Sequence, residues 1–235
     1  MEFSAQKSPV LQVRDLVKIY QMGEVQIKAL NGVTFSVYPG EFIALMGTSG
    51  SGKTTLLNLI GGLDSITSGS IALEGVNLAD MKDKELTTIR RTKMGFIFQF
   101  FNLIPVLSAY ENVELLLKVL KIPKNERKQK ILRLFDELGL GDRANNKPDQ
   151  LSGGQQQRVA IARALALDPA IILADEPTGN LDSKTTENVM DSLKKLNKEY
   201  NKTIIMVTHD KDLAKFCTRA LHMHDGQIIR EESLV

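Results

Sequence analysis

The loop "GTSGSGKT", residues 47–54, has the composition of a phosphate-binding loop. Glycines let backbone N–H groups approach an anion closely, and a following helix adds the positive end of its dipole. Lys53 is expected to reach the β- and γ-phosphates of a nucleotide, and the Thr54 hydroxyl to coordinate Mg²⁺. The alternative is a glycine-rich turn that binds nothing. It is disfavoured because Gly47, Gly52, Lys53 and Thr54 all stand between an apolar run and a predicted helix.

A second candidate anion site lies farther along the chain, in "LSGGQQQRVA", residues 151–160. Ser152, Gly153 and Gly154 open a predicted helix, and free N–H groups at a helix start attract anions. The alternative is an ordinary glycine-containing helix start. A chain of this length that carries two such sites needs a reason for the second one.

Two acids end the apolar run "AIILADE", residues 170–176. Asp175 suits the Mg²⁺ shell, through water. Glu176 is then placed to act as the general base that polarises an attacking water. A solvated pair of acids at a strand end is the alternative, which the preceding apolar residues and the phosphate loop disfavour.

Two further polar side chains end apolar runs. His209 follows "KTIIMVT", and Gln99 follows "MGFIF". His209 is expected to point at the same γ-phosphate, and the Gln99 amide to contact Mg²⁺ or the attacking water. We interpret His222 and His224 as ordinary surface or core residues.

These residues need a sheet to bring them together. The runs "FIALMG", "AIILADE" and "KTIIMVTHD" have the continuous apolar character of strands buried on both faces. Ligands bind outside the carboxyl ends of parallel strands, so the three ends are expected to converge on one site. Alternation in residues 10–20 and 27–37 predicts antiparallel strands before them, and Asp225-Gly226 predicts a hairpin near the C-terminus.

From about residue 108 to 147 the pattern changes to apolar residues at three- and four-residue spacing, with no buried strand. We therefore expect an α/β fold with a mixed sheet, an N-terminal antiparallel β subdomain and a helical insertion. The expected division is one domain over residues 1–235. Its core comprises residues 10–98 and 150–232, and its helical subdomain residues 99–149.

Composition narrows the functional classes. The net charge of +2 gives no electrostatic reason to expect nucleic acid. A single cysteine, Cys217, excludes an intramolecular disulfide framework and suits a reducing compartment. No window has the ~18 apolar residues of a membrane span, and the N-terminus lacks a secretory signal. We expect a cytoplasmic protein that reaches any membrane only through a partner.

With these motifs in order, residues 10–232 resemble an ATP-binding cassette (ABC) ATPase, with a P-loop NTPase core. The resemblance identifies a Walker A loop at residues 47–54, a Walker B strand with its glutamate at 171–176, a D-loop "GNLD" at 179–182 and the ABC signature "LSGGQ" at 151–155. Gly179 and Asn180 depart from the serine-alanine common in the D-loop. The implied nucleotide-binding residues are Tyr20, Gly47, Thr48, Ser49, Gly50, Ser51, Gly52, Lys53, Thr54, Thr55, Asp175, Ser152, Gly153, Gly154, Gln155 and Asp182.

The resemblance further implies ATP and Mg²⁺ as cofactors, with Thr54, Gln99 and Asp175 at the metal. Glu176, His209 and Gln99 are the implied catalytic residues, and Tyr20 the aromatic residue that stacks on adenine. The family forms head-to-tail homodimers in which each ATP lies between one phosphate loop and the partner's signature. The two anion sites of one chain would thus serve two different nucleotides, and hydrolysis would let the halves part.

A narrower resemblance, in "FNLIPVLSAYENVEL" and "KPDQLSGGQQQRVAIARAL", is to the lipoprotein-release and macrolide-export branch. It implies a motor subunit at the cytoplasmic face of the membrane, bound to integral-membrane permease subunits. One alternative is a regulatory ATPase of a cell-division-like complex. Another is a soluble ABC ATPase acting on the ribosome or DNA, which the single cassette and compact insertion disfavour.

An irregular apolar stretch follows Gln99 and is predicted to couple the nucleotide to the partner. About half of its members should fill the core below the insertion, and the rest should form a surface groove for a permease helix. Phe100 is the first choice for an exposed member. The stretch contains Phe100, Phe101, Leu103, Ile104, Val106 and Leu107.

Overall fold

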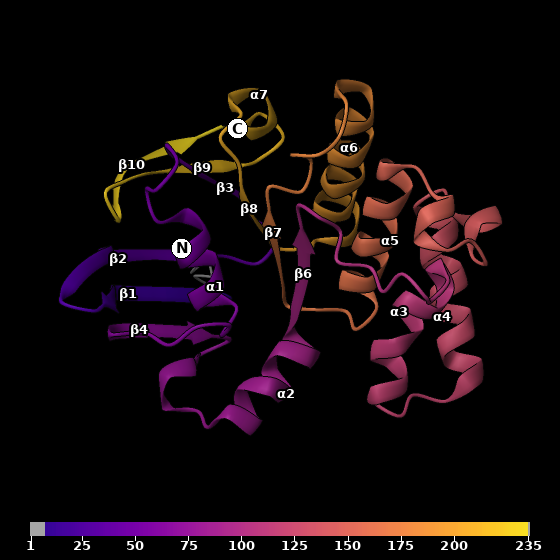
Figure 1. The fold of residues 1–235 in the computed structure, drawn as a ribbon, viewed down its shortest axis with the longest axis horizontal. Helices are drawn as coiled ribbons and strands as arrows, with labels where there is room; N and C mark the ends of the chain where they lie inside the picture. The colour runs from indigo at the N-terminus through magenta and orange to yellow at the C-terminus, as the bar shows by residue number, and fades with distance from the viewer. Residues whose placement is uncertain (1–7, 235) are drawn as a thin grey trace, which may run out of the picture.

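The computed structural model describes residues 8–234 and is built on a six-stranded sheet with the order β10-β9-β3-β8-β7-β6 (Figure 1). Strands β9, β3, β8, β7 and β6 run parallel and β10 pairs antiparallel with β9, so the predicted mixed sheet is confirmed. The strands are β3 (Phe42–Met46), β6 (Met94–Phe98), β7 (Ile171–Asp175), β8 (Ile204–Val207), β9 (Arg219–His224) and β10 (Gln227–Ser233).

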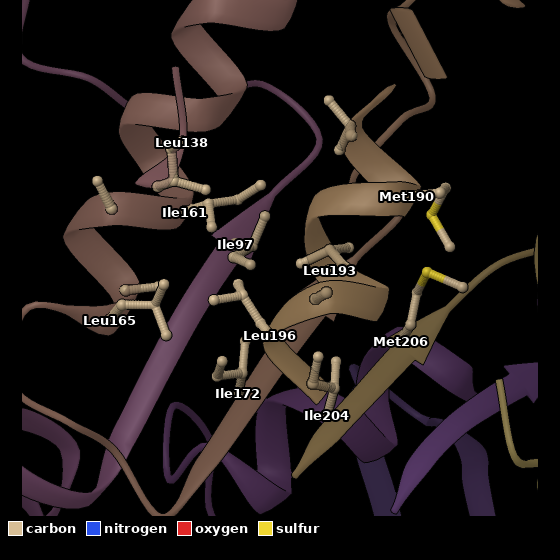
Figure 2. Close-up of a cluster of buried hydrophobic side chains, with 14 of the residues drawn as sticks. Ile97, Leu138, Ile161, Leu165, Ile172, Met190, Leu193, Leu196, Ile204 and Met206 are labelled. Atoms are coloured by element: carbon tan, nitrogen blue, oxygen red, sulfur yellow. The ribbon is translucent and has the colours of Figure 1, made fainter. Parts of the chain in front are cut away.

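The central strands are buried on both faces, which is why their sequences are continuous apolar runs. In β3, Phe42 and Ala44 face one hydrophobic core, whereas Ile43 and Leu45 face another. Figure 2 shows part of the first core, where Ile97, Ile172 and Ile204 from the sheet meet helix side chains such as Leu193. With packing on both sides, the carboxyl ends of these strands are held rigidly.

A second sheet of four strands, ordered β2-β1-β4-β5, is antiparallel throughout, and its buried side chains share the second core with the main sheet. Its strands are β1 (Leu11–Met22), β2 (Val25–Val37), β4 (Ser68–Leu73) and β5 (Val76–Asn77). Leu11, Val13 and Leu16 are buried in the second core, which also contains Leu56 and other residues of α1. The predicted N-terminal antiparallel β structure is therefore present.

Helices cover both faces of the main sheet. Figure 1 shows α1 between the two sheets and α5 and α6 beyond β6 and β7. The helices are α1 (Lys53–Ile60), α2 (Asp83–Lys93), α3 (Ala109–Val119), α4 (Lys124–Glu137), α5 (Gly153–Leu165), α6 (Ser183–Tyr200) and α7 (Lys211–Ala214), with short 3₁₀ turns at Leu78–Asp80, Gly141–Arg143 and Pro148–Gln150. Among the described residues, no helix has the length and apolar character needed to cross a membrane.

The segment between β6 and α5 contains α3, α4 and two 3₁₀ turns but no strand, and it lies at the end of the molecule away from the antiparallel sheet (Figure 1). Ser108 begins α3 with a reciprocal cap, because its hydroxyl accepts from the Glu111 N–H and the Glu111 carboxylate accepts from the Ser108 N–H. Val113 and Phe135 bury these helices against α5 in the first core. The segment thus borders both Gln99 and the signature.

Candidate nucleotide-binding and catalytic site

The phosphate loop connects β3 to α1, and two of its glycines have conformations and surroundings that exclude a side chain. Gly47 has φ +151°, and a Cβ there would lie 2.3 Å from the carbonyl oxygen of Met223. Gly52 precedes α1 with φ +98°, and its Cβ would lie 2.6 Å from the carbonyl oxygen of Ala29. The loop can therefore wrap tightly at the start of α1, where free N–H groups favour an anion.

Lys53 points into this loop rather than into solvent. Its ammonium donates to the carbonyl oxygens of Gly47 at 2.9 Å and Thr48 at 2.7 Å, and lies 3.4 Å from the Ser51 hydroxyl. Burial lowers the pKa of Lys53, and the nearby Glu176 and Asp175 oppose that effect. Phosphate oxygens entering the loop could replace these carbonyls and would relieve the buried charge more completely.

A cleft of about 350 Å³ opens on the loop and joins residues from distant parts of the chain. The predicted site residues that line it are Ser49, Gly50, Gly52, Lys53, Thr54, Thr55, Glu176 and His209. The remaining wall of the cleft is formed on β2 by Ile27, Lys28 and Ala29, which were not predicted from the sequence. Their only sequence signal is that they stand on the strand paired with the one that carries Tyr20.

Asp175 lies beside Thr54, whose hydroxyl donates to its carboxylate at 3.4 Å. Burial raises the pKa of Asp175, and the Thr54 hydrogen bond opposes this only in part. A hydroxyl and a buried, poorly compensated carboxylate fit a Mg²⁺ that takes its other ligands from water and phosphate. The described residues contain no group of three or more His, Cys, Asp or Glu that could hold a metal ion.

Glu176 and His209 meet across the neighbouring ends of β7 and β8. The Glu176 Oε1 atom lies 3.0 Å from His209 Nδ1, and both residues line the phosphate cleft. Glu176 adopts a left-handed backbone conformation with φ 43°, which is strained for a residue with a side chain. Its N–H bonds to the Val207 carbonyl at 3.1 Å, so the strained turn is anchored to the sheet.

Gln99 directly follows β6, the strand next to β7, and contacts the D-loop. Asn180 donates to the Gln99 carbonyl at 3.1 Å, and the Gln99 amide nitrogen lies 3.5 Å from Asn180 Oδ1. A Cβ on Gly179 would lie 2.8 Å from that amide nitrogen. The two unusual D-loop residues, Gly179 and Asn180, therefore form the surface on which Gln99 rests. Asp175 is the last residue of β7 and pairs with Phe98, the residue of β6 that directly precedes Gln99.

The signature forms the start of α5 and is separate from the phosphate cleft, whose described lining includes none of its residues. The Ser152 hydroxyl accepts from the Gln155 N–H at 3.3 Å, and the Gln155 side chain accepts from the Ser152 N–H at 2.9 Å. Gly153 is half-buried and Gly154 buried, the latter against Thr185 of α6. The signature is thus a preorganised helix start, as expected, and it lies outside the chain's own phosphate site.

Two other predicted residues, Asp182 and Tyr20, are not among the described lining of the phosphate cleft. Asp182 caps α6, where its carboxylate accepts from the N–H of Thr185 at 3.0 Å and from its hydroxyl at 2.7 Å. Tyr20 stands on β1 directly opposite Ile27, which lines the phosphate cleft. The Tyr20 hydroxyl donates to Asp64 at 2.7 Å.

Comparison with known proteins decides the family. The model of the family described as "ABC transporter" matches residues 30–179, more than half of the chain. The chain belongs to the ABC transporter family. It is 52% identical over 230 residues to an uncharacterized ABC transporter ATP-binding protein, MJ0796, of Methanocaldococcus jannaschii, with 96% of this chain and 97% of that protein covered. A solved dimeric structure of that cassette, in a post-hydrolysis state with ADP and Pi bound, superimposes with a TM-score of 0.87 at 50% identity and covers 96% of this chain and 99% of the other.

Another relative indicates the branch of the ABC transporter family. The chain is 42% identical over 223 residues to the lipoprotein-releasing system ATP-binding protein LolD of Alcanivorax borkumensis, with 95% of this chain and 98% of that protein covered. It is also 45% identical over 228 residues to the macrolide export ATP-binding/permease protein MacB of Syntrophobacter fumaroxidans. That match covers 96% of this chain but only 32% of the much longer MacB protein. The resemblance to this branch that the sequence indicated is confirmed.

Two polar side chains of α5, Arg163 and Gln157, hold neighbouring loops in place by hydrogen bonds to backbone carbonyls. Neither residue was predicted from the sequence. Arg163 donates to the carbonyls of Phe101 at 2.8 Å and Asn102 at 2.5 Å, and both of these residues have positive φ. Gln157 is fully buried and donates to the Pro177 carbonyl at 2.6 Å, next to Glu176. The sequence feature that could have indicated these roles is that each residue is polar and lies in a helix rich in apolar residues.

The apolar stretch after Gln99 differs from the expectation that about half of its members fill the core and the rest form a surface groove. Phe100 and Val106 are each 73% exposed and Ile104 is 38% exposed, while the other three are half-buried. A groove of about 450 Å³ lies beside it, with Ile104 as the stretch's one lining member among the described residues. Most of the lining belongs to α2, β6, α3 and the end of α5, and its described members do not include Phe100. Lining residues include Phe96, Phe98, Leu115, Leu116, Ala164 and Leu167.

Proposed function

We propose that this chain is the Mg²⁺-dependent ATPase subunit of a transporter or mechanotransmission complex of the lipoprotein-release and macrolide-export type. The observation that carries the proposal is the Glu176–His209 pair, 3.0 Å apart at the phosphate cleft that Lys53 also lines. The relatives named for lipoprotein release and macrolide export support transport over an action on ribosomes or DNA. Cargo is then selected by separate membrane subunits.

The proposed reaction follows from what each side chain can do. When ATP binds, the Lys53 ammonium leaves the Gly47 and Thr48 carbonyls and donates to oxygens of the β- and γ-phosphates. The N–H groups at the start of α1 bind the same phosphates. Thr54, Asp175 through water, and Gln99 would hold Mg²⁺, which would supply positive charge to neutralise the phosphates. Glu176 accepts the proton of the attacking water, and His209 orients Glu176 and contacts the γ-phosphate.

The proposed active unit is a head-to-tail homodimer with ATP between the subunits. The phosphate cleft of this chain has no described lining from Ser152, Gly153 or Gly154, so those residues are available to a second nucleotide. The start of α5 would complete the partner's site with N–H groups and the Ser152 hydroxyl. Asp182 at the start of α6 is expected to face the same interface.

Coupling to the membrane is proposed to occur at the groove between α2, β6 and α3. The groove is lined mainly by apolar side chains, with Arg90, Arg91 and Arg163 among its polar members. A short cytoplasmic helix of a permease fits such a surface. The position of the groove beside the Phe101–Asn102 turn, which Arg163 holds, gives a route from Gln99 to the partner. The subunit is thus placed at the cytoplasmic face of the membrane, as a peripheral component.

Substitution of the proposed base tests the function directly. Glu176→Gln should keep ATP binding but reduce hydrolysis by about 10²–10⁴-fold, because an amide does not accept the water's proton. Retained γ-phosphate should then give an ATP-dependent dimer on size-exclusion chromatography, absent with ADP. Glu199→Gln, an exposed acid at the end of α6, is the matched control.

Two results would contradict the proposal. One is near-wild-type hydrolysis by Glu176→Gln, which would remove the base assignment. The other is wild-type hydrolysis that continues at full rate after EDTA treatment, which would remove the role of Mg²⁺.

A further inference from the structure

A buried ion pair lies beneath Tyr20, outside the phosphate cleft. Lys18 of β1 is only 6% exposed, and its ammonium contacts Asp64 Oδ1 at 2.8 Å and the Ser65 carbonyl at 2.6 Å. The second carboxylate oxygen of Asp64 accepts from the Tyr20 hydroxyl at 2.7 Å. The Lys18 ammonium also lies 4.6 Å from the centroid of the Tyr20 ring. Lys18, Tyr20 and Asp64 therefore form one connected cluster.

This cluster fixes the Tyr20 ring at its edge and on one face. The hydrogen bond to Asp64 defines where the hydroxyl end lies, and the ammonium occupies one face through a cation–π contact. A flat ligand can stack only on the opposite face. Burial and the Asp64 hydrogen bond raise the pKa of Tyr20.

The cluster also joins the ring to the phosphate loop. Asp64 lies just beyond α1, the helix that begins at Lys53, and Tyr20 stands opposite Ile27 in the β1–β2 pairing. Ile27 lines the phosphate cleft. A nucleotide whose phosphates bind at the start of α1 therefore meets a ring whose position is set from the other end of the same helix.

We propose that Asp64 and Lys18 are positioning residues for nucleotide binding, which hold the Tyr20 ring ready to stack on the base. The inference rests on the proposed function as an ATPase, and on the role in base stacking that the family resemblance implies for Tyr20. Without the cluster the ring would be ordered only on binding, and that loss of preorganisation weakens the nucleotide. The effect should act on the base and leave the phosphate contacts of Lys53 unchanged.

The test compares ADP with inorganic pyrophosphate, which lacks the base and ribose, by isothermal titration calorimetry on the full chain. Asp64→Asn should weaken ADP binding about three- to tenfold and change pyrophosphate binding less than about twofold. Tyr20→Phe keeps the ring and every charge but loses the Asp64 contact, and should shift ADP in the same direction. In a Tyr20→Ala background, Asp64→Asn should have no further effect on ADP.

Three results would overturn the inference. ADP and pyrophosphate weakened equally by Asp64→Asn would mean that the cluster acts through α1 and the phosphate loop. An unchanged ADP affinity in Tyr20→Phe would mean that the Asp64 contact does not position the ring. A full Asp64→Asn effect in the Tyr20→Ala background would also mean that the Asp64 contact does not position the ring.

Failure of the wild-type chain to bind ADP or ATP would instead refute the proposed function itself. Thermal melts of each variant identify unfolding, and Tyr20→Phe supplies the test if Asp64→Asn does not fold.

Discussion

Gly154 stands on α5 at a point where an added methyl group has no room, so Gly154→Ala measures how tightly the signature helix packs on α6. A Cβ on Gly154 would lie 2.3 Å from Thr185 Cγ2, whereas the next nearest atoms are Thr185 Cβ at 3.7 Å and Oγ1 at 4.0 Å. The clash is therefore with one methyl group. Thr185→Ser removes that methyl group and keeps the hydroxyl that donates to Asp182 at 2.7 Å.

The expected magnitude follows from these contacts. Overpacking of this kind costs about 1–3 kcal/mol. If Thr185 rotates away instead, it loses its hydrogen bond to the Asp182 carboxylate, which also destabilises the fold. Alanine gains about 0.5–1 kcal/mol over glycine inside a helix. Gly154→Ala alone should therefore destabilise the fold, and in the Thr185→Ser background it should be neutral or stabilising.

Urea unfolding of the four proteins of this double-mutant cycle gives the coupling between the two sites, expected at about 1–3 kcal/mol. Gly153→Ala is the control, because its Cβ would meet only the flexible end of Leu181, at 3.0 Å, and Phe101, at 3.8 Å. A coupling below about 0.5 kcal/mol would refute the packing argument. If the double variant regains stability but not ATP hydrolysis, Gly154 has the second role proposed for it at the partner's nucleotide.

Three further predictions concern nucleotide binding, coupling and the thiol. Lys53→Ala should weaken ADP at least about tenfold in calorimetry, because it removes charge-assisted phosphate contacts; an unchanged affinity would contradict its assigned role. Leu115→Glu, in the groove and 38% exposed, should abolish co-purification with the permease but retain basal ATPase activity. Val119→Glu, on the same helix, 49% exposed and outside the described groove lining, should retain both co-purification and basal ATPase activity. Burial raises the pKa of Cys217 to about 12, so a thiol reagent at pH 8 should react fully only after denaturation, and rapid reaction of the folded chain would contradict the burial.

The strand ends could be predicted because a strand buried on both faces must be apolar along its length, and the polar residue that follows must leave the core. This physics places Glu176 and His209 at one edge from sequence alone, and the structure brings them to 3.0 Å. Contacts through backbone carbonyls could not be predicted in the same way. The grip of Arg163 on Phe101 and Asn102 depends on local backbone turns, which no periodicity records.

The groove lining was mispredicted for a related reason. An irregular segment has no period from which to decide which side chains face inward, so composition indicates that apolar residues gather there but not where each one points. Lys18 shows the opposite limit. It occupies a buried position in a strand of alternating pattern, and its charge there is balanced by Asp64 and the Ser65 carbonyl, which follow α1 in the chain.

The left-handed backbone at Phe101, Asn102 and Glu176 has a consequence for how the sequence can evolve or be engineered. Such conformations cost about 1–3 kcal/mol each for residues with side chains. Selection for thermal stability alone would favour glycine at the Phe101 and Glu176 positions, because glycine adopts a positive φ without steric cost. A stabilised variant obtained that way would lose the carboxylate that faces His209. Libraries built for stability should therefore hold these three positions constant and seek their gains elsewhere, in the strands and helices that carry the loops.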